Sequence, residues 1–175
     1  IDPTVAIFED MYISKKGEPS PTYSQIMNRL PIINQRDFYS GGLPKSDEKI
    51  ATRYNDSFNK MLEVIFDLHQ KGIAIVPGTD GLPGFLYHRE LELYEKSGIP
   101  AAEVLKLATI KSAELTGVSE LYGSIEVGKK ADLILIDGNP LENISNIRNV
   151  EWTMKEGKLF YAKELYNSVG IKYFK

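Results

Sequence analysis

Residues 72–80 constrain the fold of this chain more than any other stretch. They read Gly-Ile-Ala-Ile-Val-Pro-Gly-Thr-Asp, so a short apolar run meets a Pro-Gly break and stops at one carboxylate, Asp80. A strand that is apolar on both faces is typical of a parallel sheet buried between two layers. The sequence therefore predicts a buried strand over residues 73–77 with Asp80 at its carboxyl end.

The preceding segments predict a βαβ unit. Residues 3–8, Pro-Thr-Val-Ala-Ile-Phe, are predicted to form another buried strand, and Ser46 to cap a long amphipathic helix over residues 47–71. Strand, helix and strand in this order imply a right-handed parallel crossover, the unit from which α/β barrels are built. Barrel enzymes carry their chemistry at the carboxyl ends of the strands, so Asp80 is predicted to face an active-site mouth. Asp80 capping the next turn through its side chain is the alternative.

Two further residues are candidates for substrate binding. Glu9 follows the first predicted strand, so it can face the same mouth or simply be solvated. His88 lies eight residues after Asp80 and can contact substrate or anchor a loop. The other histidine, His69, is predicted to bond the last carbonyls of its helix.

The segment of residues 10–45 has little periodicity and four prolines, which is typical of a functional loop or of disorder. It carries several Tyr and Arg residues, so a lid that grips a substrate carboxylate through an arginine is one interpretation. A disordered insertion is the other, and the sequence leaves both open.

The predicted secondary structure changes within the second half of the chain. Helices are predicted first, and short strands broken by turns follow. Three helices are predicted: one over residues 86–97, one that starts at Pro100, and one over residues 110–116 that Thr109 caps. Strands are predicted over residues 123–128, 131–137 and 150–161, the last of them folded into a hairpin by a turn at 155–158.

Composition excludes several classes of protein. The chain has 175 residues, enough for about one domain and an appendage, and a net charge of -3, which gives no reason to expect nucleic acid or an anionic membrane as partner. It has no cysteine, so disulfides and thiolate metal sites are excluded and a cytoplasmic location is expected. No apolar run approaches the ~20 residues of a membrane span. The first residues do not have the pattern of a signal peptide and do not include an initiator methionine, so we expect this chain to be a piece of a longer protein.

Three stretches together resemble the C-terminal part of the metal-dependent amidohydrolase superfamily, of the imidazolonepropionase-like and cyclic amidohydrolase type. The first is Gly-Thr-Asp at 78–80, and the second is Ala-Thr-Ile-Lys-Ser-Ala-Glu-Leu-Thr-Gly at 108–117. The third, Gly-Ser-Ile-Glu-Val-Gly-Lys-Lys-Ala-Asp-Leu-Ile-Leu-Ile-Asp at 123–137, is long and specific. The resemblance covers roughly residues 70–161.

The resemblance implies an α/β fold: the C-terminal part of a (β/α)8 TIM barrel and part of a small β-sandwich. Residues 1–122 are expected to supply barrel strands seven and eight with their helices, including the loop or lid at 10–45. Residues 123–162 are expected to supply strands of the composite sandwich, and residues 163–175 a C-terminal tail.

The resemblance also implies chemistry. In this family one or two divalent metal ions, zinc being the metal expected here, activate water that hydrolyses a non-peptide carbon–nitrogen bond of a small molecule. Asp80 matches the carboxylate that binds metal and acts as general base. Relatives that cleave carbon–oxygen or carbon–halogen bonds, or deaminate a ring, share this machinery.

The family's remaining metal ligands include a His-x-His pair, which this chain lacks, since its two histidines are isolated. The chain alone is therefore expected to be inactive and to need the N-terminal part of the barrel. A non-catalytic structural or assembly module is the alternative. Exposed sheet edges and apolar faces also predict self-association, with a homo-oligomer as one form.

Overall fold

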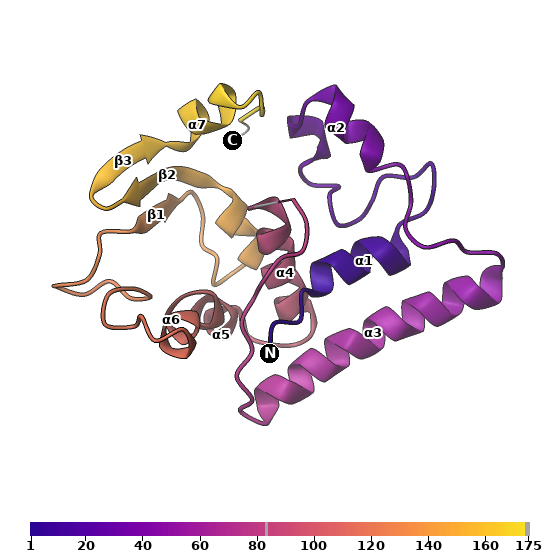
Figure 1. Cartoon of the computed structure of the whole chain (residues 1–175), viewed down its shortest axis with the longest axis horizontal. Helices are drawn as coiled ribbons and strands as arrows, with labels where there is room; N and C mark the ends of the chain where they lie inside the picture. Colours follow the sequence, from indigo (N-terminus) through magenta and orange to yellow (C-terminus); the bar gives the residue numbers. More distant parts are fainter. Residues whose placement is uncertain (83, 174–175) are drawn as a thin grey trace.

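A computed structural model describes residues 1–82 and 84–173. The chain forms helices throughout its first two thirds and a small sheet near its end (Figure 1). The α-helices are α1 (Val5–Ile13), α2 (Ile32–Asp37), α3 (Glu48–Gln70), α4 (Phe85–Lys96), α5 (Ala101–Lys106), α6 (Ser112–Leu115) and α7 (Ala162–Ser168). Shorter turns of helix are η1 (Met27–Arg29), η2 (Leu107–Lys111) and η3 (Ile144–Arg148). The strands are β1 (Leu133–Ile136), β2 (Val150–Lys155) and β3 (Lys158–Tyr161).

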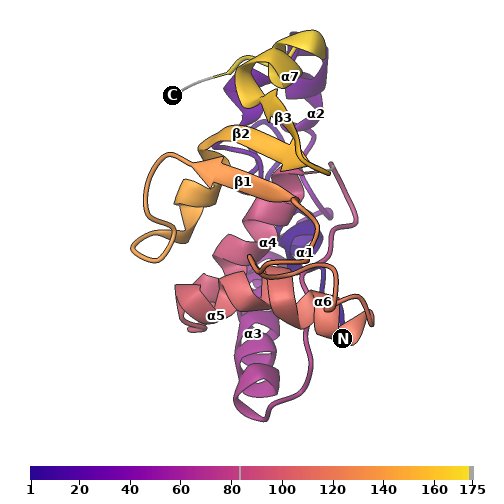
Figure 2. The same cartoon turned by 90° about the vertical axis from the view of Figure 1, so that its left-hand side faces the viewer.

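Helix α4 occupies the centre of the molecule. It contacts α1, α3, α5 and η3, and the two views place the sheet and α3 at opposite ends with α4 between them (Figures 1 and 2). Seven of its residues are buried, including Leu93 and Tyr94, which have no exposed surface. The core of the chain is therefore assembled around α4.

The long amphipathic helix predicted over 47–71 is confirmed as α3. Its buried residues Phe58, Leu62 and Ile65 follow the helical repeat. The cap is Asp47 rather than the predicted Ser46, since the Asp47 side chain accepts a hydrogen bond from the Ile50 amide. Ser46 instead donates to the Asp47 carboxylate.

The strand predicted over residues 3–8 is wrong, because α1 begins at Val5. Thr4 takes a left-handed conformation, with φ 45, that separates the extended start of the chain from the helix. The Glu90 side chain then accepts hydrogen bonds from the first two helical amides, those of Val5 and Ala6. An apolar run this short fits either a buried strand or a helix, so periodicity alone could not decide.

The buried strand predicted over residues 73–77 is wrong, because these residues lie outside the sheet and are only partly buried, with Ile73 43% exposed. The amino group of Ile1 donates to the Ala74 carbonyl, and the Val76 amide donates to the Ile1 carbonyl. This is the hydrogen-bond pattern of a parallel bridge between Ile1 and Ile75. The predicted crossover is thus reduced to one bridge, with α3 in the connection.

The two helices predicted around Thr109 form one continuous run instead. Residues 107–111 make a π-helical turn that joins α5 to α6. The Thr109 hydroxyl donates to the Leu105 carbonyl within the run, so it does not cap a new helix. Gly117 follows the end of the run and has φ 74°, a left-handed conformation that suits glycine at a helix C-terminus.

The sheet confirms the strands predicted within 131–137 and 150–161. Strands β1, β2 and β3 are antiparallel neighbours in chain order. The predicted hairpin turn is present, with Glu156 and Gly157 both at positive φ, as a two-residue turn between strands requires. Residues 123–128 form no strand. A Cβ on Gly123 would lie 2.8 Å from the Ile110 Cα, so this segment bends closely over the helical run.

The segment of residues 10–45 packs on the body of the chain. The Tyr23 and Phe38 rings stack with centroids 4.3 Å apart, and Ser14 and Ser20 both donate hydrogen bonds to the Asp10 carboxylate. After α7, the Lys172 amide donates to the Arg29 carbonyl, which ties the last described residues to η1. Within the described residues no helix has the length and apolar character needed to cross a membrane.

Candidate functional site

Asp80 lies in the bend that follows the extended residues 73–77. Its side chain is exposed, and within residues 1–82 and 84–173 no hydrogen bond or ion pair engages its carboxylate. The capping role that was its alternative therefore has no support among these contacts. A carboxylate without a protein partner keeps both oxygens available to a ligand.

A second carboxylate, that of Asp2, reaches the same bend. A Cβ added to Gly78 would lie 2.0 Å from an Asp2 carboxylate oxygen, so only glycine leaves room for this approach. Asp2 follows Ile1 in the parallel bridge, and Asp80 follows the other partner of that bridge. The bridge thus brings two acidic side chains to the carboxyl ends of neighbouring extended segments.

Tyr23, from the segment of residues 10–45, approaches the turn after Asp80, whose Gly81 remains exposed. The Tyr23 hydroxyl lies 3.3 Å from the position of a Cβ on Gly81. Burial and the negative charge of Asp10 raise the pKa of Tyr23, and hydrogen bonding with the Leu82 backbone opposes them.

Glu9 is held inside the molecule and not at an open mouth. It is 2% exposed, and Arg89 of α4 grips it with a two-pronged contact, Nε to Oε2 at 2.8 Å and Nη2 to Oε1 at 2.7 Å. The Thr22 hydroxyl also donates to Glu9. These partners give Glu9 a structural role in place of the substrate contact predicted from its position.

Arg89 also begins a chain of buried ion pairs. Its Nη1 donates to Glu92 at 2.9 Å, and the other Glu92 oxygen accepts from Arg148 of η3 at 2.6 Å. Burial would raise the pKa of Glu92, but the two guanidinium groups outweigh it and lower the value. The series Glu9–Arg89–Glu92–Arg148 joins α1, α4 and η3, and charge-assisted bonds of this kind are short and directional.

Glu90 is the most deeply buried carboxylate, with no exposed surface. Its oxygens accept from the amides of Val5 at 3.0 Å and Ala6 at 2.7 Å, where the α1 dipole favours negative charge. Burial nevertheless raises the pKa of Glu90 to about 7, helped by the charge of Asp2. Glu90 therefore anchors the start of α1 and, through it, Asp2.

His88 is largely buried on α4, and its Nδ1 atom has no hydrogen-bond partner. Burial and the positive charge of Arg148 lower its pKa to about 4, so the imidazole is neutral at pH 7. His88 lies on the helix that directly follows the Asp80 turn, which leaves a ligand contact open to it.

The described residues do not complete a metal centre. Within residues 1–82 and 84–173, no group of three or more His, Asp or Glu side chains is arranged to hold a metal ion. Asp80 fits one ligand of such a centre because its carboxylate is exposed and unengaged.

Comparison with known proteins places the chain in a family. The sequence pattern of the amidohydrolase family matches residues 6–160. The chain belongs to the amidohydrolase family. A curated relative, the 5'-deoxyadenosine deaminase of Methanobrevibacter smithii, is 31% identical over 160 residues, which cover 75% of this chain and 34% of the relative.

Other amidohydrolase relatives also align with this chain over only a part of their own length. Imidazolonepropionase of Thermoanaerobacter pseudethanolicus is 39% identical over 110 residues, 60% of this chain and 24% of the relative. A crystal structure of a Xaa-Pro dipeptidase with methionine in its active site superposes with a TM-score of 0.59 and 27% identity, covering 78% of this chain and 33% of that one. The chain spans about a third of the length of these proteins or less.

Sequence reasoning within this amidohydrolase chain missed Asp2, Glu90 and the ion-pair series. The Gly78 and Asp2 contact joins residues far apart in the chain, so no local spacing signals it. The Arg-Glu pattern at 89–92 was visible, but similar patterns usually form solvated helix faces. Burial, which distinguishes the two cases, is known only from the fold.

Replacing Arg89 with Met should destabilise the chain strongly, because Glu9 and Glu92 would remain buried without their shared cation. We expect a loss of about 3–5 kcal/mol in the free energy of unfolding, measured in urea. The matched control is Lys60→Met, which removes an ion pair to Glu63 whose two side chains are 69% and 63% exposed, and it should cause no measurable loss. Equal effects of the two changes would contradict this interpretation.

The buried carboxyl of Glu90 predicts a pH dependence. Since its pKa rises from 4.5 to about 7 on folding, the folded chain keeps a proton that the unfolded chain releases. Its stabilising contribution is full below pH 4.5 and is lost as pH rises through about 7. Glu90→Gln should remove this loss, measured as the difference between variant and wild type in unfolding free energy against pH.

The pKa of His88 falls on folding, so His88 makes the unfolding free energy rise with pH, the opposite of Glu90. His88 is present in both the wild type and Glu90→Gln, so its contribution cancels in their difference. Glu95→Gln on the same helix is the control and should leave the slope unchanged. A slope retained in Glu90→Gln would refute the assignment of this titration to Glu90.

Proposed function

We propose that the complete protein containing this chain is a metal-dependent amidohydrolase that hydrolyses a non-peptide carbon–nitrogen bond in a small molecule. One observation carries the proposal: the free carboxylate of Asp80 follows an extended segment that is bridged in parallel to Ile1, in a chain of this family. In the proposal Asp80 binds the metal and acts as general base.

The relatives support this reaction class. Several curated relatives are deaminases or imidazolonepropionases, which act on carbon–nitrogen bonds. A bound divalent ion, expected to be zinc, supplies Lewis acidity and lowers the pKa of water. Asp80 would accept the proton of the attacking water and deliver it to the leaving nitrogen, a role open to it because its carboxylate is exposed and unengaged among the described residues.

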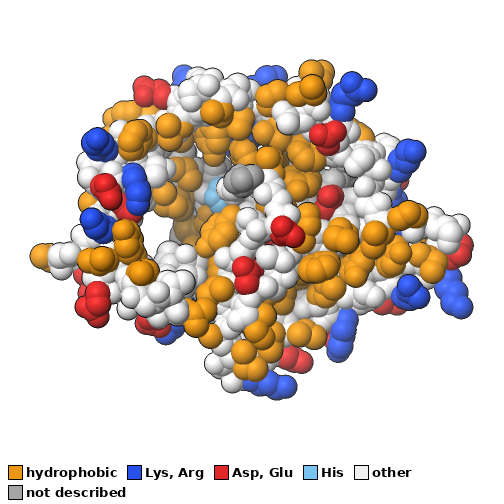
Figure 3. Space-filling view, viewed as in Figure 1, with side chains coloured by type: hydrophobic (Ala, Val, Ile, Leu, Met, Phe, Trp, Pro, Cys, Tyr) orange, Lys and Arg blue, Asp and Glu red, His pale blue; other side chains and the backbone are white. Residues whose placement is uncertain are grey.

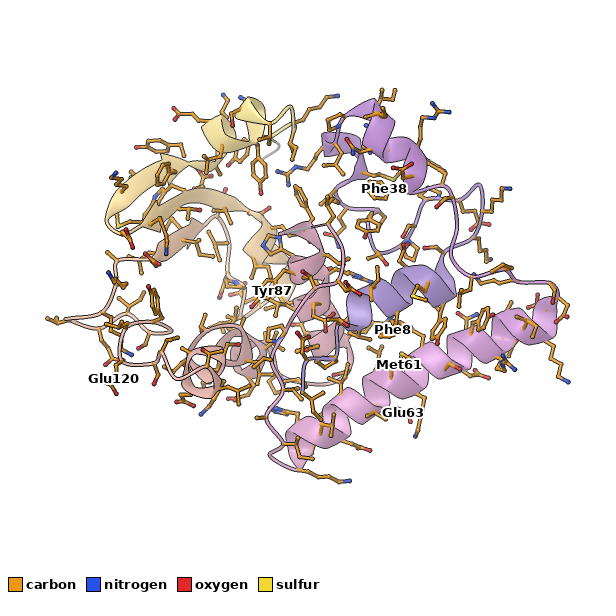
Figure 4. The ribbon with its side chains drawn as sticks, in the orientation of Figure 1. Phe8, Phe38, Met61, Glu63, Tyr87 and Glu120 are labelled. Atoms are coloured by element: carbon orange, nitrogen blue, oxygen red, sulfur yellow. The ribbon has the colours of Figure 1, made fainter. Side chains whose placement is uncertain are left out.

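We infer that the rest of the barrel and the remaining metal ligands come from the N-terminal part of the protein. An apolar groove of about 460 Å³ runs between α1 and α3, and Phe8 and Met61 line it. Figure 4 labels these two side chains on the facing helices, and Figure 3 shows hydrophobic side chains gathered there. Residues 1–122 are proposed to complete a (β/α)8 barrel with that part, and residues 123–162 to complete a β-sandwich.

The exposed surfaces of the sheet also support the proposal that the N-terminal part of the protein packs against this chain. Ile134 and Leu135 of the edge strand β1 are 53% and 46% exposed and point to opposite faces, so this strand offers an unpaired edge among the described strands and an exposed apolar side chain on each face. Without the N-terminal part the chain should self-associate through these surfaces, which sedimentation of the isolated chain would reveal as oligomers. We place the protein in the cytoplasm, in keeping with its lack of cysteine.

Asp80→Asn in the complete protein should lower kcat by at least about 10²–10⁴-fold, because an amide can neither accept the water proton nor bind metal as a carboxylate does. The thermal unfolding midpoint of the metal-free protein should not fall, since Asp80 has no partner among the described residues. Asp56→Asn on the exposed face of α3 is the control and should keep full activity. Wild-type turnover in Asp80→Asn would overturn the proposed role.

The second candidate is a non-catalytic module that keeps the amidohydrolase framework. It is favoured by one observation, the incomplete set of metal donors in residues 1–82 and 84–173. A His-x-His pair after an apolar strand in the N-terminal part, together with bound divalent metal, would eliminate it. A complete protein without metal or that pair would favour it.

A further inference from the structure

Arg29 of η1 is a buried cation whose charge is not balanced by the described residues. It is 9% exposed, and its Nε donates to the Lys172 carbonyl at 3.0 Å. Its guanidinium carbon lies 4.6 Å from the centre of the Tyr166 ring and 5.6 Å from that of Phe85. No carboxylate in residues 1–82 and 84–173 forms an ion pair with it. Burying a cation is costly unless an anion accompanies it.

The neighbouring His88 also lacks a partner, at its buried Nδ1 atom. The charged groups that act on it are Arg29 from η1, Arg148 from η3 and Glu92 from its own helix. Glu92 is already shared by Arg148 and Arg89, so it leaves no free carboxylate for His88 or Arg29.

The local charge is therefore positive. Three guanidinium groups, of Arg29, Arg89 and Arg148, face two carboxylates, of Glu9 and Glu92, which leaves one positive charge in excess. A neutral imidazole that carries its proton on Nδ1 can add a hydrogen bond to an anion next to this charge. The rings of Phe85 and Tyr166 provide an apolar wall beside it.

We propose that Arg29 and His88 bind the carboxylate of an apolar organic acid, so that the substrate of the proposed hydrolase carries a carboxylate beside its scissile carbon–nitrogen bond. That the ligand is the substrate rests on the proposed function. That the ligand is an anion rests on the excess positive charge around Arg29 and His88. Phe85, whose ring centre lies 5.6 Å from the Arg29 guanidinium carbon, begins α4, the helix that follows Asp80 in the sequence. The candidate anion site and the candidate catalytic carboxylate are therefore close in sequence.

The proposal predicts a signature at His88 that does not depend on metal or turnover. A bound carboxylate offsets the positive charges of Arg29 and Arg148 and accepts a hydrogen bond from the imidazole, so the pKa of His88 should rise from about 4 when the ligand binds. Imidazole proton signals of the metal-free complete protein report this pKa. The His88 signal is identified as the one lost in His88→Gln, and His69 serves as internal reference.

The test compares phenylacetate with its neutral isostere phenylacetamide. Phenylacetate should bind saturably and raise the His88 pKa, whereas phenylacetamide should do neither and His69 should not move. Arg29→Gln should weaken phenylacetate binding about tenfold or more, because a charge-assisted contact is lost, and Arg53→Gln on the exposed face of α3 should not. An unchanged His88 pKa in saturating phenylacetate, or equal binding of the amide, would overturn the proposal.

The comparison of the two ligands uses wild-type protein, so it stands even if Arg29→Gln fails to fold. Asp80→Asn should bind phenylacetate as the wild type does. If phenylacetate binds but Asp80→Asn stays active, the proposed catalytic role of Asp80 is wrong and the anion site stands. If Asp80→Asn loses turnover but phenylacetate does not bind, the anion site is wrong and the catalytic role stands.

Discussion

The two-pronged contact between Arg89 and Glu9 is the interaction on which the arrangement of this chain depends. It is buried, and it connects the first helix to the central one across 80 residues of sequence. Because Arg89 also bonds Glu92, and Glu92 bonds Arg148, the same contact fixes the turn that leads into the sheet. Removing Arg89 leaves Glu9 without its cation, and removing Glu92 leaves Arg148 without its anion, so these two central members hold the series together.

The anchoring of α1 has a direct consequence for the candidate site. With Arg89 holding Glu9 in the middle of α1 and Glu90 holding its first amides, the preceding extended residues are fixed against residues 73–78. The carboxylates of Asp2 and Asp80 then follow two bridged segments. The chain thus supplies one candidate metal ligand, and its described residues contain no group of three or more donors that could hold a metal ion.

Local patterns predicted the elements that local physics determines. The 23 residues of α3 carry a full amphipathic repeat, and the β2–β3 hairpin is specified by its turn residues. The strand predicted over 3–8 failed because a distant carboxylate, that of Glu90, satisfies the first amides of a helix there. The strand predicted over 123–128 is absent, and its first residue, Gly123, packs closely against Ile110 of the helical run instead. Asp80 is a candidate from its position alone, whereas the burial of Glu9 and the contacts of Arg29 and Arg89 depend on the whole fold.

The most direct test of the central claim is a crystal structure of the complete protein grown with zinc, with anomalous scattering recorded at the zinc edge. The account predicts a zinc peak about 2.0–2.2 Å from a carboxylate oxygen of Asp80, with the remaining ligands contributed by the N-terminal part of the protein. Zinc bound elsewhere, with the Asp80 carboxylate turned to solvent away from it, would contradict the account.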